Sequence, residues 1–465
     1  MKILPVLTLS ILLACFSCRK TSFISSKDAQ ITITADTLKF DTVFTSAGSV
    51  TQSFIIINDN NQPLRLTSVK LMGGSTAAFK MNVDGTAGPE VDNLELAAND
   101  SLYVFVQVNI DPNADQLPFV LKDSIQISYN GNDRQVQLEA WGQNAHFLRN
   151  KIITTDETWN NDLPYVILGY LSVNANATLT INKGCRIYMH ADAPLIIDGS
   201  LKVAGEKDTA DRVYFRGDRL DEPYKDYPAA WPGIFFRQTS HDNTLTFAVI
   251  KNAYQAIALQ DPSPNASPKL TLNECMIDNA YDAGIISLNS SITATNCLVS
   301  NCGKNIVLAK GGNYTFTHCT AVSISNNFIL HKEPVLYISN FITDNNTPVP
   351  ADLNAVFRNC IFWGENGTAE DEVVAEKTGG AAFNALFDYG LWKVTNVPAA
   401  VSVNQVISNI SPAFDSVNTA KNYYNFRLKE GSPAIDAGTN AGITLDLDGN
   451  PRPVGLPDLG CYEKQ

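Results

Sequence analysis

Charged residues are scarce in this chain, and the basic ones are the scarcer kind. They make up 17% of the 465 residues, with 34 Lys and Arg against 47 Asp and Glu, and the formal net charge is −13. Affinity for nucleic acids comes mainly from Lys and Arg on phosphates, so we expect no nucleic-acid partner. The same deficit argues against electrostatic docking on an anionic membrane surface.

Long apolar runs are missing after the first twenty residues. The one early run, Ile3–Ala14, follows Lys2 and is too short to span a bilayer as a helix, but it has the length of a signal-peptide core. It ends at Cys15 in the phrase Leu-Leu-Ala-Cys, which resembles the lipobox of bacterial lipoproteins. In that family the Cys is acylated and becomes the mature N-terminus. Cys18 is a second candidate, and an ordinary secretory signal is the alternative.

These features predict a signal peptide at residues 1–18 and a polar tether at 19–30. We therefore expect an exported lipoprotein, anchored at the outer membrane and facing either the cell surface or the periplasm. A lipid is its only expected membrane attachment, because no further long apolar run follows.

Between residues 31 and 145 apolar and polar residues alternate strictly. Turn-forming stretches rich in Asn, Asp and Gly interrupt the alternation, as between antiparallel strands. About seven or eight short strands of this kind suit a β-sandwich. The pattern and its closing stretch, Leu138–Gly142, resemble the immunoglobulin-like domains of the ASPM/SPD-2/Hydin type.

From about residue 150 to 465 the pattern becomes an internal repeat of short strands. Cys275, Cys297 and Cys319 end similar phrases 22 residues apart, and Cys360 ends another copy 41 residues later. A unit of this length, with three short strands and no helical stretch, is typical of one coil of a parallel β-helix. The predicted fold class is therefore all-β, with an immunoglobulin-like sandwich followed by a parallel β-helix.

Several phrases in this region resemble the right-handed, single-stranded parallel β-helix proteins, the pectate-lyase-like solenoids, including members from Bacteroidetes-type bacteria. They are Gly199–Gly205 with Val213-Tyr-Phe, Trp231–Ile234, Gly431–Gly438, and Asp458–Glu463 in an expected C-terminal capping region. The resemblance covers residues 150–465 and implies the fold more strongly than any activity.

The four repeated cysteines are predicted to form a buried structural ladder. Inward side chains of successive coils stack about 4.8 Å apart, which is wider than the usual Cβ separation in a disulfide. Metal ligands must converge on one point, whereas a ladder places them along a line. We therefore expect Cys275, Cys297, Cys319 and Cys360 to be reduced and packed in the core.

The resemblance also implies which catalytic phrases to expect, and they are missing. The Asn-Thr-Asp, Asp-Asp and Gly-His-Gly phrases of polygalacturonases do not occur, nor does the Trp-Val-Asp-His phrase of pectate lyases. No histidine forms a His-x-x-x-His pair, and His318, beside a ladder cysteine, is expected to point outward. The sequence therefore predicts no catalytic residues and no cofactor.

Two loops are weaker candidates for ligand contact. The charged and aromatic loop that begins at Arg216 offers Arg216, Asp218 and Tyr224 as contacts, with an ordinary solvated loop as the alternative. Asp446 and Asp448 stand in an Asp-x-Asp-Gly phrase similar to Ca²⁺ loops, but the distal Glu of a complete loop is replaced by Pro457. A capping turn is the alternative to a Ca²⁺ site there.

Tyr254 and Tyr281 are the best candidates for sugar contact, because they occupy matching Asn-Ala-Tyr turns on either side of an inserted Pro-rich loop. The expected function is a non-catalytic glycan-binding or adhesive module of the cell envelope, with a polysaccharide or surface glycan as partner. The alternatives are a polysaccharide lyase or glycoside hydrolase of atypical type, and a purely structural envelope component.

Overall fold

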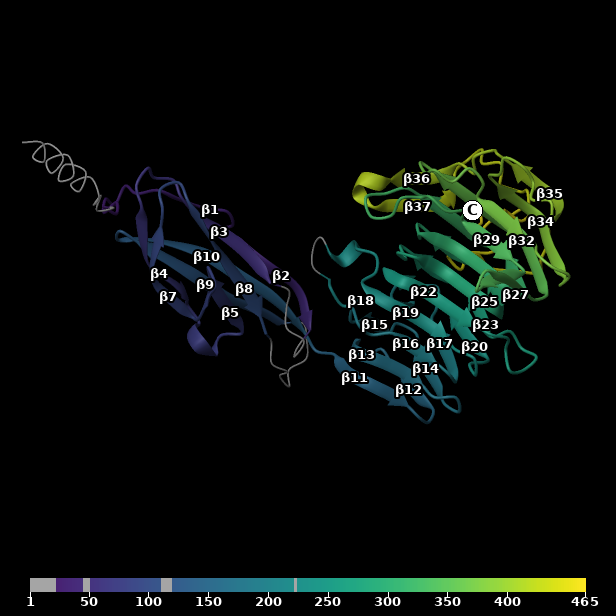
Figure 1. The fold of residues 1–465 in the computed structure, drawn as a ribbon, viewed down its shortest axis with the longest axis horizontal. Coiled ribbons are helices and arrows are strands. Elements are labelled where there is room, and N and C mark those ends of the chain that lie inside the picture. Colours follow the sequence, from purple (N-terminus) through teal and green to yellow (C-terminus); the bar gives the residue numbers. More distant parts are fainter. Residues whose placement is uncertain (1–21, 45–50, 110–118, 221–223) are drawn as a thin grey trace, which may run out of the picture. The chain divides into compact units, whose positions relative to one another are not determined.

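The computed structural model confirms an all-β chain in which a β-sandwich precedes a parallel β-helix (Figure 1). It describes residues 22–44, 51–109, 119–220 and 224–465. The chain divides into two compact units, residues 1–144 and 145–465. Across the described ranges, no helix is long and apolar enough to cross a membrane.

The first unit contains two five-stranded sheets. Inward side chains of both sheets, such as Phe54 and Val104 from one and Leu138 from the other, form one apolar core, which explains the alternation in the sequence. Among the described pairings of this unit, only β2 with β10 is parallel. One sheet has the order β1 (Ile31–Ile33), β3 (Gln52–Asn58), β8 (Ser101–Val108), β5 (Phe79–Val83) and β6 (Thr86–Ala87), and the other has the order β2 (Thr37–Phe44), β10 (Asn132–Gln143), β9 (Phe119–Tyr129), β4 (Leu64–Leu71) and β7 (Glu90–Leu96).

The second unit winds through a 23-stranded sheet whose strands pair in parallel from one coil to the next. Three faces result, and each receives one strand segment per coil. The face that we call the open face is made by β12 (Glu157–Trp159), β14 (Thr178–Asn182), β17 (Ser200–Ala204), β20 (Asn243–Thr246), β23 (Leu270–Asn273), the later parts of β25 (Ala283–Thr295) and β27 (Lys304–Thr317), and the early parts of β32 (Leu353–Glu365), β34 (Phe383–Trp392) and β35 (Ser402–Ser408).

The covered face is the next one along each coil. It consists of the early parts of β11 (His146–Ile153) and β13 (Tyr165–Val173), then β15 (Arg186–Met189), β18 (Val213–Gly217), β21 (Ala248–Lys251), β24 (Met276–Asp278), β26 (Leu298–Ser300), β28 (Thr320–Ile324) and the later parts of β32, β34 and β35.

The third face closes the coil. It consists of the later parts of β11 and β13, then β16 (Leu195–Ile197), β19 (Trp231–Phe236), β22 (Ala253–Gln260), the early parts of β25 and β27, β29 (Leu336–Ser339) and β33 (Val373–Glu376). Two insertions leave the coil between this face and the open face. They are the Pro-rich loop 261–268 and the hairpin of β30 (Phe341–Asp344) and β31 (Thr347–Pro350).

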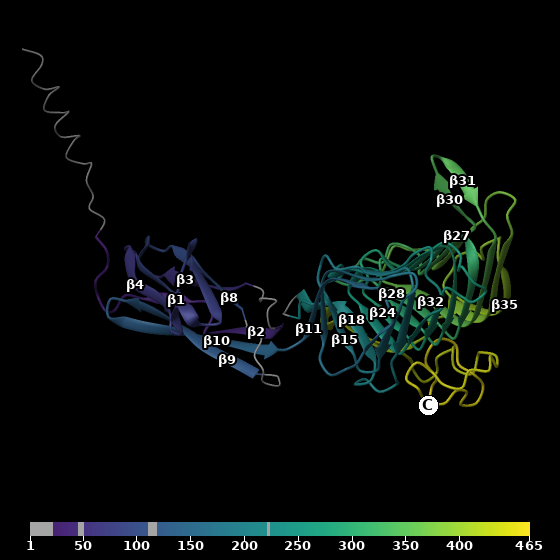
Figure 2. The same ribbon diagram turned by 90° about the horizontal axis from the view of Figure 1, so that it is seen from below.

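The C-terminal segment, for which the sequence predicts a capping region, comprises residues 409–465. It runs along the covered face, where apolar side chains of the coils meet Phe426, Leu447, Leu428 and Leu459. Its hairpin consists of β36 (Phe414–Asn418) and β37 (Tyr423–Leu428). Figure 2 shows this segment on the side of the coils opposite to the β30–β31 hairpin. Where the segment lies, outward side chains of the coils such as Val322, Ile361 and Leu391 are apolar, and the segment shields them from water.

A buried ion pair fixes the C-terminal segment in place. Arg452 Nε lies 2.9 Å from Glu463 Oε2, and both side chains are fully buried. The same guanidinium donates to Asn296 Oδ1 at 2.8 Å, which joins the segment to a corner of the coil. Since every charge in this cluster has a partner, the pair locks one arrangement of the segment against the coils.

Candidate functional site

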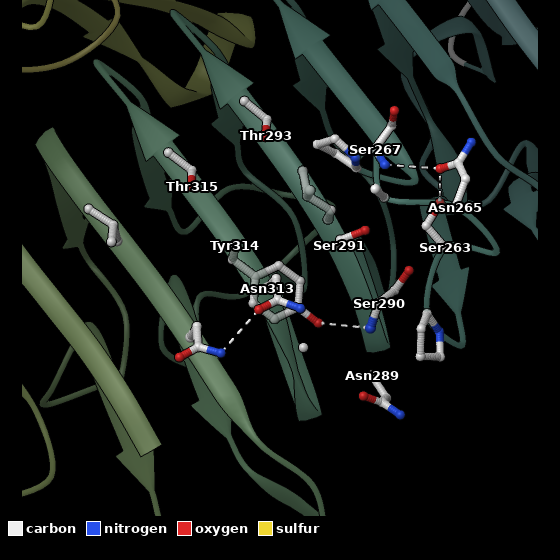
Figure 3. A pocket seen from close by; sticks show the side chains of 17 residues that line it. Ser263, Asn265, Ser267, Asn289, Ser290, Ser291, Thr293, Asn313, Tyr314 and Thr315 are labelled. Atoms are coloured by element: carbon white, nitrogen blue, oxygen red, sulfur yellow. Dashed lines mark hydrogen bonds between the residues drawn. The ribbon is translucent and has the colours of Figure 1, made fainter. Parts of the chain in front are cut away.

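A groove lies on the open face of the β-helix beneath the Pro-rich loop. It has a volume of about 420 Å³. The loop 261–268 forms one wall, and outward side chains of three neighbouring coils form the floor (Figure 3). Its seventeen lining residues include Ser, Thr, Asn, Pro and Tyr, but no Asp, Glu, Lys, Arg or His. The groove is therefore polar without being charged.

Hydrogen bonds hold the Pro-rich loop over the groove. Asn265 Oδ1 accepts from Ser263 Oγ and from the Ser267 N–H, each at 3.0 Å, which closes a tight turn at the tip of the loop (Figure 3). The Asn265 amide donates to Asp242 Oδ2 at 2.9 Å. The loop thus forms a fixed wall rather than a loose insertion.

A buried lysine anchors the base of the same loop. Lys269 is fully buried, and its Nζ donates to the carbonyl oxygens of Arg237, Gln238 and Gln260 at 3.1, 3.2 and 2.7 Å. Burial lowers the pKa of Lys269 to about 8, although the charge of Asp261 opposes this shift. The three carbonyl bonds compensate the ammonium for the water that it has lost.

The floor of the groove depends on a close approach between coils. Gly312 has φ of +116°, and a Cβ there would overlap the carbonyl oxygen of Ser290 in the preceding coil. Ser290 is buried, and its Oγ has no hydrogen-bond partner among the residues of the described ranges. Beside it, Tyr314 Oη donates to the Gly311 carbonyl at 3.0 Å. The coils are therefore packed closely under the groove, around a buried hydroxyl whose hydrogen-bonding capacity is unused.

A ladder of threonines crosses the groove and continues beyond it. Thr244, Thr271, Thr293 and Thr315 pair in register on four successive strands of the open face, and all of them reach solvent. Figure 3 shows Thr293 and Thr315 side by side on neighbouring strands. Because parallel strands lie about 4.8 Å apart, the hydroxyls repeat at that spacing along the coil axis.

An amide ladder runs parallel to the threonines. Asn354 Nδ2 donates to Asn313 Oδ1 at 3.1 Å, and Asn384 Nδ2 donates to Asn354 Oδ1 at 2.9 Å. All three side chains are exposed. The open face therefore presents two rows of neutral donors and acceptors, both directed along the coil axis.

The structure brings the two predicted tyrosines together, but away from the groove. The rings of Tyr254 and Tyr281 are stacked, with centroids 5.8 Å apart and planes inclined by 27°, and the residues are 46% and 55% exposed. Tyr254 lies near the start of β22, whereas the Pro-rich loop follows the end of that strand. At about 3.3 Å per residue, the length of β22 separates the two places by roughly 20 Å.

The charged loop after β18 folds against its own residues. Arg216 Nη2 donates to the Lys225 carbonyl at 3.3 Å, and Tyr224 carries the Arg219 guanidinium over its ring at 3.4 Å. Asp218 Oδ2 lies 2.7 Å from His190 Nδ1, and burial raises the pKa of Asp218. The three predicted contacts Arg216, Asp218 and Tyr224 thus take part in local packing, and none lines the groove.

The Asp-x-Asp-Gly phrase forms a tight turn in the C-terminal segment. Asp446 Oδ1 accepts from the N–H groups of Asp448 and Asn450 at 2.9 and 2.8 Å, and its Oδ2 accepts from the Glu463 N–H at 3.1 Å. Both oxygens of Asp448 accept from Arg427 at 2.7 Å. The two carboxylates point to different partners. Within the described ranges, no group of three or more His, Cys, Asp or Glu residues could hold a metal ion.

The ladder cysteines Cys275, Cys297, Cys319 and Cys360 are free and buried in the β-helix core. Their thiols donate to backbone carbonyls, as from Cys275 Sγ to Leu245 O at 3.3 Å. Burial raises the pKa of Cys275, Cys297 and Cys319 well above the usual value for a thiol. These thiols are therefore poor nucleophiles at neutral pH.

The expectation that His318 points outward is wrong. The residue is buried under the C-terminal segment, where its Nδ1 lies 3.1 Å from the Asp458 carbonyl oxygen and its Nε2 lies 2.9 Å from Asn359 Nδ2. Burial lowers the pKa of His318 to about 3, so that the ring is neutral. The lipidation candidates Cys15 and Cys18 lie outside the described residues.

Sequence reasoning missed the groove, although its signal was present. A threonine stands four residues before each of Cys275, Cys297 and Cys319. These positions face outward wherever the cysteines face inward, so the repeat that predicts the core also predicts a polar ladder. What the sequence could not supply is the position of the Pro-rich loop over that ladder.

No protein-family model matches the sequence, and no curated protein matches it either. Among solved structures, the chain is similar to the ASH/PapD-like domain of human CEP192 (PapD-like domain 7), with 11% identity and a TM-score of 0.19, over 28% of this chain and 94% of that one. It is also similar to a family 123 glycoside hydrolase from Clostridium perfringens, with 12% identity and a TM-score of 0.20.

That second likeness covers 28% of this chain and 30% of the enzyme, so it spans less than a third of the enzyme's length. A third likeness is to the SafA pilin of Salmonella enterica in complex with the SafB chaperone, with 15% identity and a TM-score of 0.17, over 25% of this chain and 55% of that one. At these values the likenesses carry no inference about what this chain binds or does.

Proposed function

We propose that this protein is a non-catalytic binding module for a neutral polysaccharide, and that the groove on the open face is its binding site. The observation that carries the proposal is the groove of about 420 Å³ lined by hydroxyl and amide side chains without a charge. Concave sites with a few convergent polar groups are the usual location of ligands on protein surfaces. Uncharged hydroxyls and amides complement the hydroxyl groups of a neutral sugar.

The direction of the ladders supports an extended ligand. Threonine hydroxyls and asparagine amides repeat once per coil along the axis, and the Thr244–Thr315 row spans about 14 Å at 4.8 Å per step. A polymer lying along this row meets the same donors and acceptors again at each coil. Each contact is weak, so affinity is expected to grow with polymer length and with the number of copies on a surface.

The lining of the groove favours binding over cleavage. Glycoside hydrolysis usually requires two carboxyl groups that flank the scissile bond, and a lyase requires a base near the abstracted proton. The groove has hydroxyls and amides at its surface instead. A lyase or hydrolase of atypical type remains the rival function, and a purely structural envelope component is the third.

The tyrosine pair is our second candidate for sugar contact. Tyr254 and Tyr281 form a stacked and solvent-exposed aromatic surface, and aromatic rings contribute roughly 1 kcal/mol each in comparable contacts. We assign this pair an accessory role, because it does not line the groove. Arg216, Asp218 and Tyr224 support the neighbouring loop rather than the sugar.

The experiment that tests the function compares two substitutions in the same row of the open face. Thr293→Arg places a bulky cation in the groove, and Thr180→Arg places one in the same row outside it. Lys202 already occupies this row, so a long cationic side chain is compatible with the fold there. Binding is measured on an array of neutral and acidic polysaccharides, with release of reducing sugar followed in parallel.

We expect binding to neutral polymers, at least a tenfold loss of affinity for Thr293→Arg, and wild-type affinity for Thr180→Arg. Equal affinity of both variants would place the site elsewhere. Release of reducing sugar by the wild-type protein would replace the binding function with an enzymatic one. Absence of binding across the array would favour the structural role.

We also propose that the chain is an exported lipoprotein of the outer membrane, acylated at Cys15. The support is the apolar run that ends in Leu-Leu-Ala-Cys. Cells that express the protein are labelled with an alkyne palmitate, and Cys15→Ala is compared with Cys18→Ala. Labelling lost only in Cys15→Ala is the expected result, labelling lost only in Cys18→Ala moves the site, and labelling kept in both variants contradicts lipidation at these positions.

A further inference from the structure

A second cleft lies on the covered face, where the C-terminal hairpin leaves a gap above the coils. It is bounded by the outer side of β21, β24 and β26 and by the β36–β37 hairpin, and its volume is about 270 Å³. A smaller recess of about 40 Å³ continues from it toward Asp226 and Phe328. Both hollows share four lining residues, Lys251, Asp278, Asn422 and Tyr424.

The walls of this cleft are aromatic and apolar, unlike those of the groove. Val249, Met276 and Leu298 come from the coils, and four aromatic residues come from the C-terminal segment. One of these, Tyr423, is 54% exposed, and another, Tyr462, carries the Arg427 guanidinium over its ring at 4.6 Å. The four aromatic residues are Tyr423, Tyr424, Phe426 and Tyr462. Such walls suit a ligand with an apolar ring face.

One donor and one acceptor lie side by side in the cleft. Lys251 and Asp278 are register partners on neighbouring strands, and their side chains form an ion pair of 3.0 Å. Asp278 Oδ1 also accepts from Ser300 Oγ at 2.8 Å, in the next coil. The charge of Asp278 raises the pKa of Lys251, so the ammonium stays protonated at neutral pH. The pair keeps 44% and 22% of its side-chain surface exposed and accessible to a ligand.

We propose that this cleft binds a single neutral sugar ring, at a site separate from the polymer groove. An ammonium donor beside a carboxylate acceptor matches two adjacent hydroxyls of a pyranose, since one hydroxyl accepts from Lys251 while its neighbour donates to Asp278. The C–H face of the ring then packs against the aromatic wall. The inference does not depend on polymer binding at the open face, because it rests on other residues and another face of the coil.

Together with the polymer groove proposed above, the cleft would allow one molecule to bind two glycans at the same time. A polysaccharide chain along the open face and a sugar unit in the cleft are held by one molecule at once. Such a module cross-links two glycans or grips one branched glycan twice, and the second contact is strengthened by the first.

The test uses methyl glycosides of glucose, galactose and mannose as probes and saturation-transfer NMR on the full chain. The key variant is Lys251→Met. The matched control is Lys304→Met, because Lys304 and Asp282 form an equivalent ion pair of 3.2 Å, with side chains 44% and 25% exposed, which does not line the cleft. A second variant, Tyr423→Ala, changes an exposed residue of the wall and therefore tests the cleft without endangering the fold.

We expect saturation transfer to the ring protons of at least one glycoside. Affinity should fall at least tenfold in Lys251→Met and several-fold in Tyr423→Ala, and it should stay unchanged in Lys304→Met and in the groove variant Thr293→Arg. Absence of transfer from all three glycosides, or equal affinities for Lys251→Met and Lys304→Met, overturns the proposal. Loss of glycoside binding in Thr293→Arg would show that the probes occupy the groove instead.

Discussion

The open face and the covered face are built by the same coils, yet they have opposite surroundings. On the open face, outward positions carry Thr and Asn side chains that reach solvent. On the covered face, the outward positions carry Val322, Ile361 and Leu391, which lie under the C-terminal segment. The difference teaches that the coil supplies only a scaffold, and that the outward residues of each strand decide whether a face stays open to solvent or is covered by a later segment of the chain.

The difference between the two faces can be recognised in the burial pattern along individual strands. The β27 stretch on the open face alternates between exposed and buried residues, whereas all five residues of β28 on the covered face are buried. A strand that is buried on both sides has no reason to alternate. Short strands without alternation, such as Leu298–Ser300, therefore indicate a face that another segment covers.

The largest effect is expected from removing the Arg452–Glu463 ion pair, which holds the C-terminal segment against the covered face. Arg452→Met leaves the Glu463 carboxylate buried without a counter-charge, so we expect the free energy of unfolding to fall by about 3–5 kcal/mol. Thr293→Arg, an outward change on the open face, should alter it by less than about 0.5 kcal/mol. Urea denaturation monitored by circular dichroism measures both. The double variant Arg452→Met, Glu463→Leu should recover part of the loss, and a loss as large as in the single variant would contradict the role of the lone charge.

The buried cysteine thiols are expected to make the folded protein less stable at alkaline pH. Burial raises the pKa of Cys185 to about 11 and that of Cys461 to about 12, and it raises the pKa of Cys275, Cys297 and Cys319 well above the usual value for a thiol. Folded thiols therefore stay protonated above pH 9, where unfolded thiols ionise, so their stabilising contribution is complete below pH 9 and is lost as pH rises above it. Each such thiol steepens the loss by about 1.4 kcal/mol per pH unit.

Urea denaturation between pH 8 and 10.5 measures this slope. Cys297→Ala should have a shallower slope than the wild type, because one raised thiol is missing. Thiol titration at neutral pH gives a second check, with few reactive groups in the native state and several more after denaturation. An identical pH slope in the variant, or disulfide-linked peptides among Cys275, Cys297 and Cys319, would contradict the buried ladder.

A smaller loss of stability is expected when the Pro-rich loop, which forms the wall of the groove, loses its anchor at Lys269. Lys269→Met removes the donor to three carbonyl oxygens at the base of the loop, and we expect a loss of about 1–3 kcal/mol. Limited proteolysis should then cut within residues 261–268, while the wild-type loop resists cleavage. Uncut loops in the variant would show that Lys269 does not hold the wall.

The same variant changes the response to pH. The pKa of Lys269 is lowered to about 8 in the folded state, whereas an unfolded Lys titrates near 10.5, so the unfolded state binds more protons between these values. The cost of burying this ammonium is complete below pH 8 and is relieved as pH rises toward 10.5. The stability of the wild type relative to Lys269→Met should therefore increase across this window, and a constant difference would contradict the lowered pKa.

The smallest effect is expected from the tyrosine pair. Tyr254→Ala with Tyr281→Ala removes exposed rings, so stability should change by less than about 1 kcal/mol. Affinity for the neutral polysaccharide should fall by no more than about tenfold, less than in Thr293→Arg. A loss larger than that of Thr293→Arg would transfer the primary site from the groove to the tyrosines. Unchanged affinity would remove the tyrosines from the binding surface.

The fold class could be predicted because the sequence contains two different periodicities. Alternation over residues 31–145 gives the sandwich, and the 22-residue spacing of Cys275, Cys297 and Cys319 gives the coil. The same repeat also identified the positions of Tyr254 and Tyr281, since matching turns in successive coils must lie side by side.

Long-range contacts were the part that could not be predicted. His318 was expected to face solvent because it precedes the inward-facing Cys319, but its partner carbonyl belongs to Asp458, 140 residues later. The two hollows depend on contacts of the same kind, since one lies under an inserted loop and the other under a returning hairpin. A local pattern specifies which side chains face outward but not which later segment arrives above them.

The most direct test of the central claim is hydrogen–deuterium exchange, measured with and without the neutral polysaccharide that binds most tightly on the array. The account predicts slower exchange in the Pro-rich loop 261–268 and in residues 289–293. Protection confined to the covered face or to the turns at Tyr254 and Tyr281, with none at the groove, would contradict it.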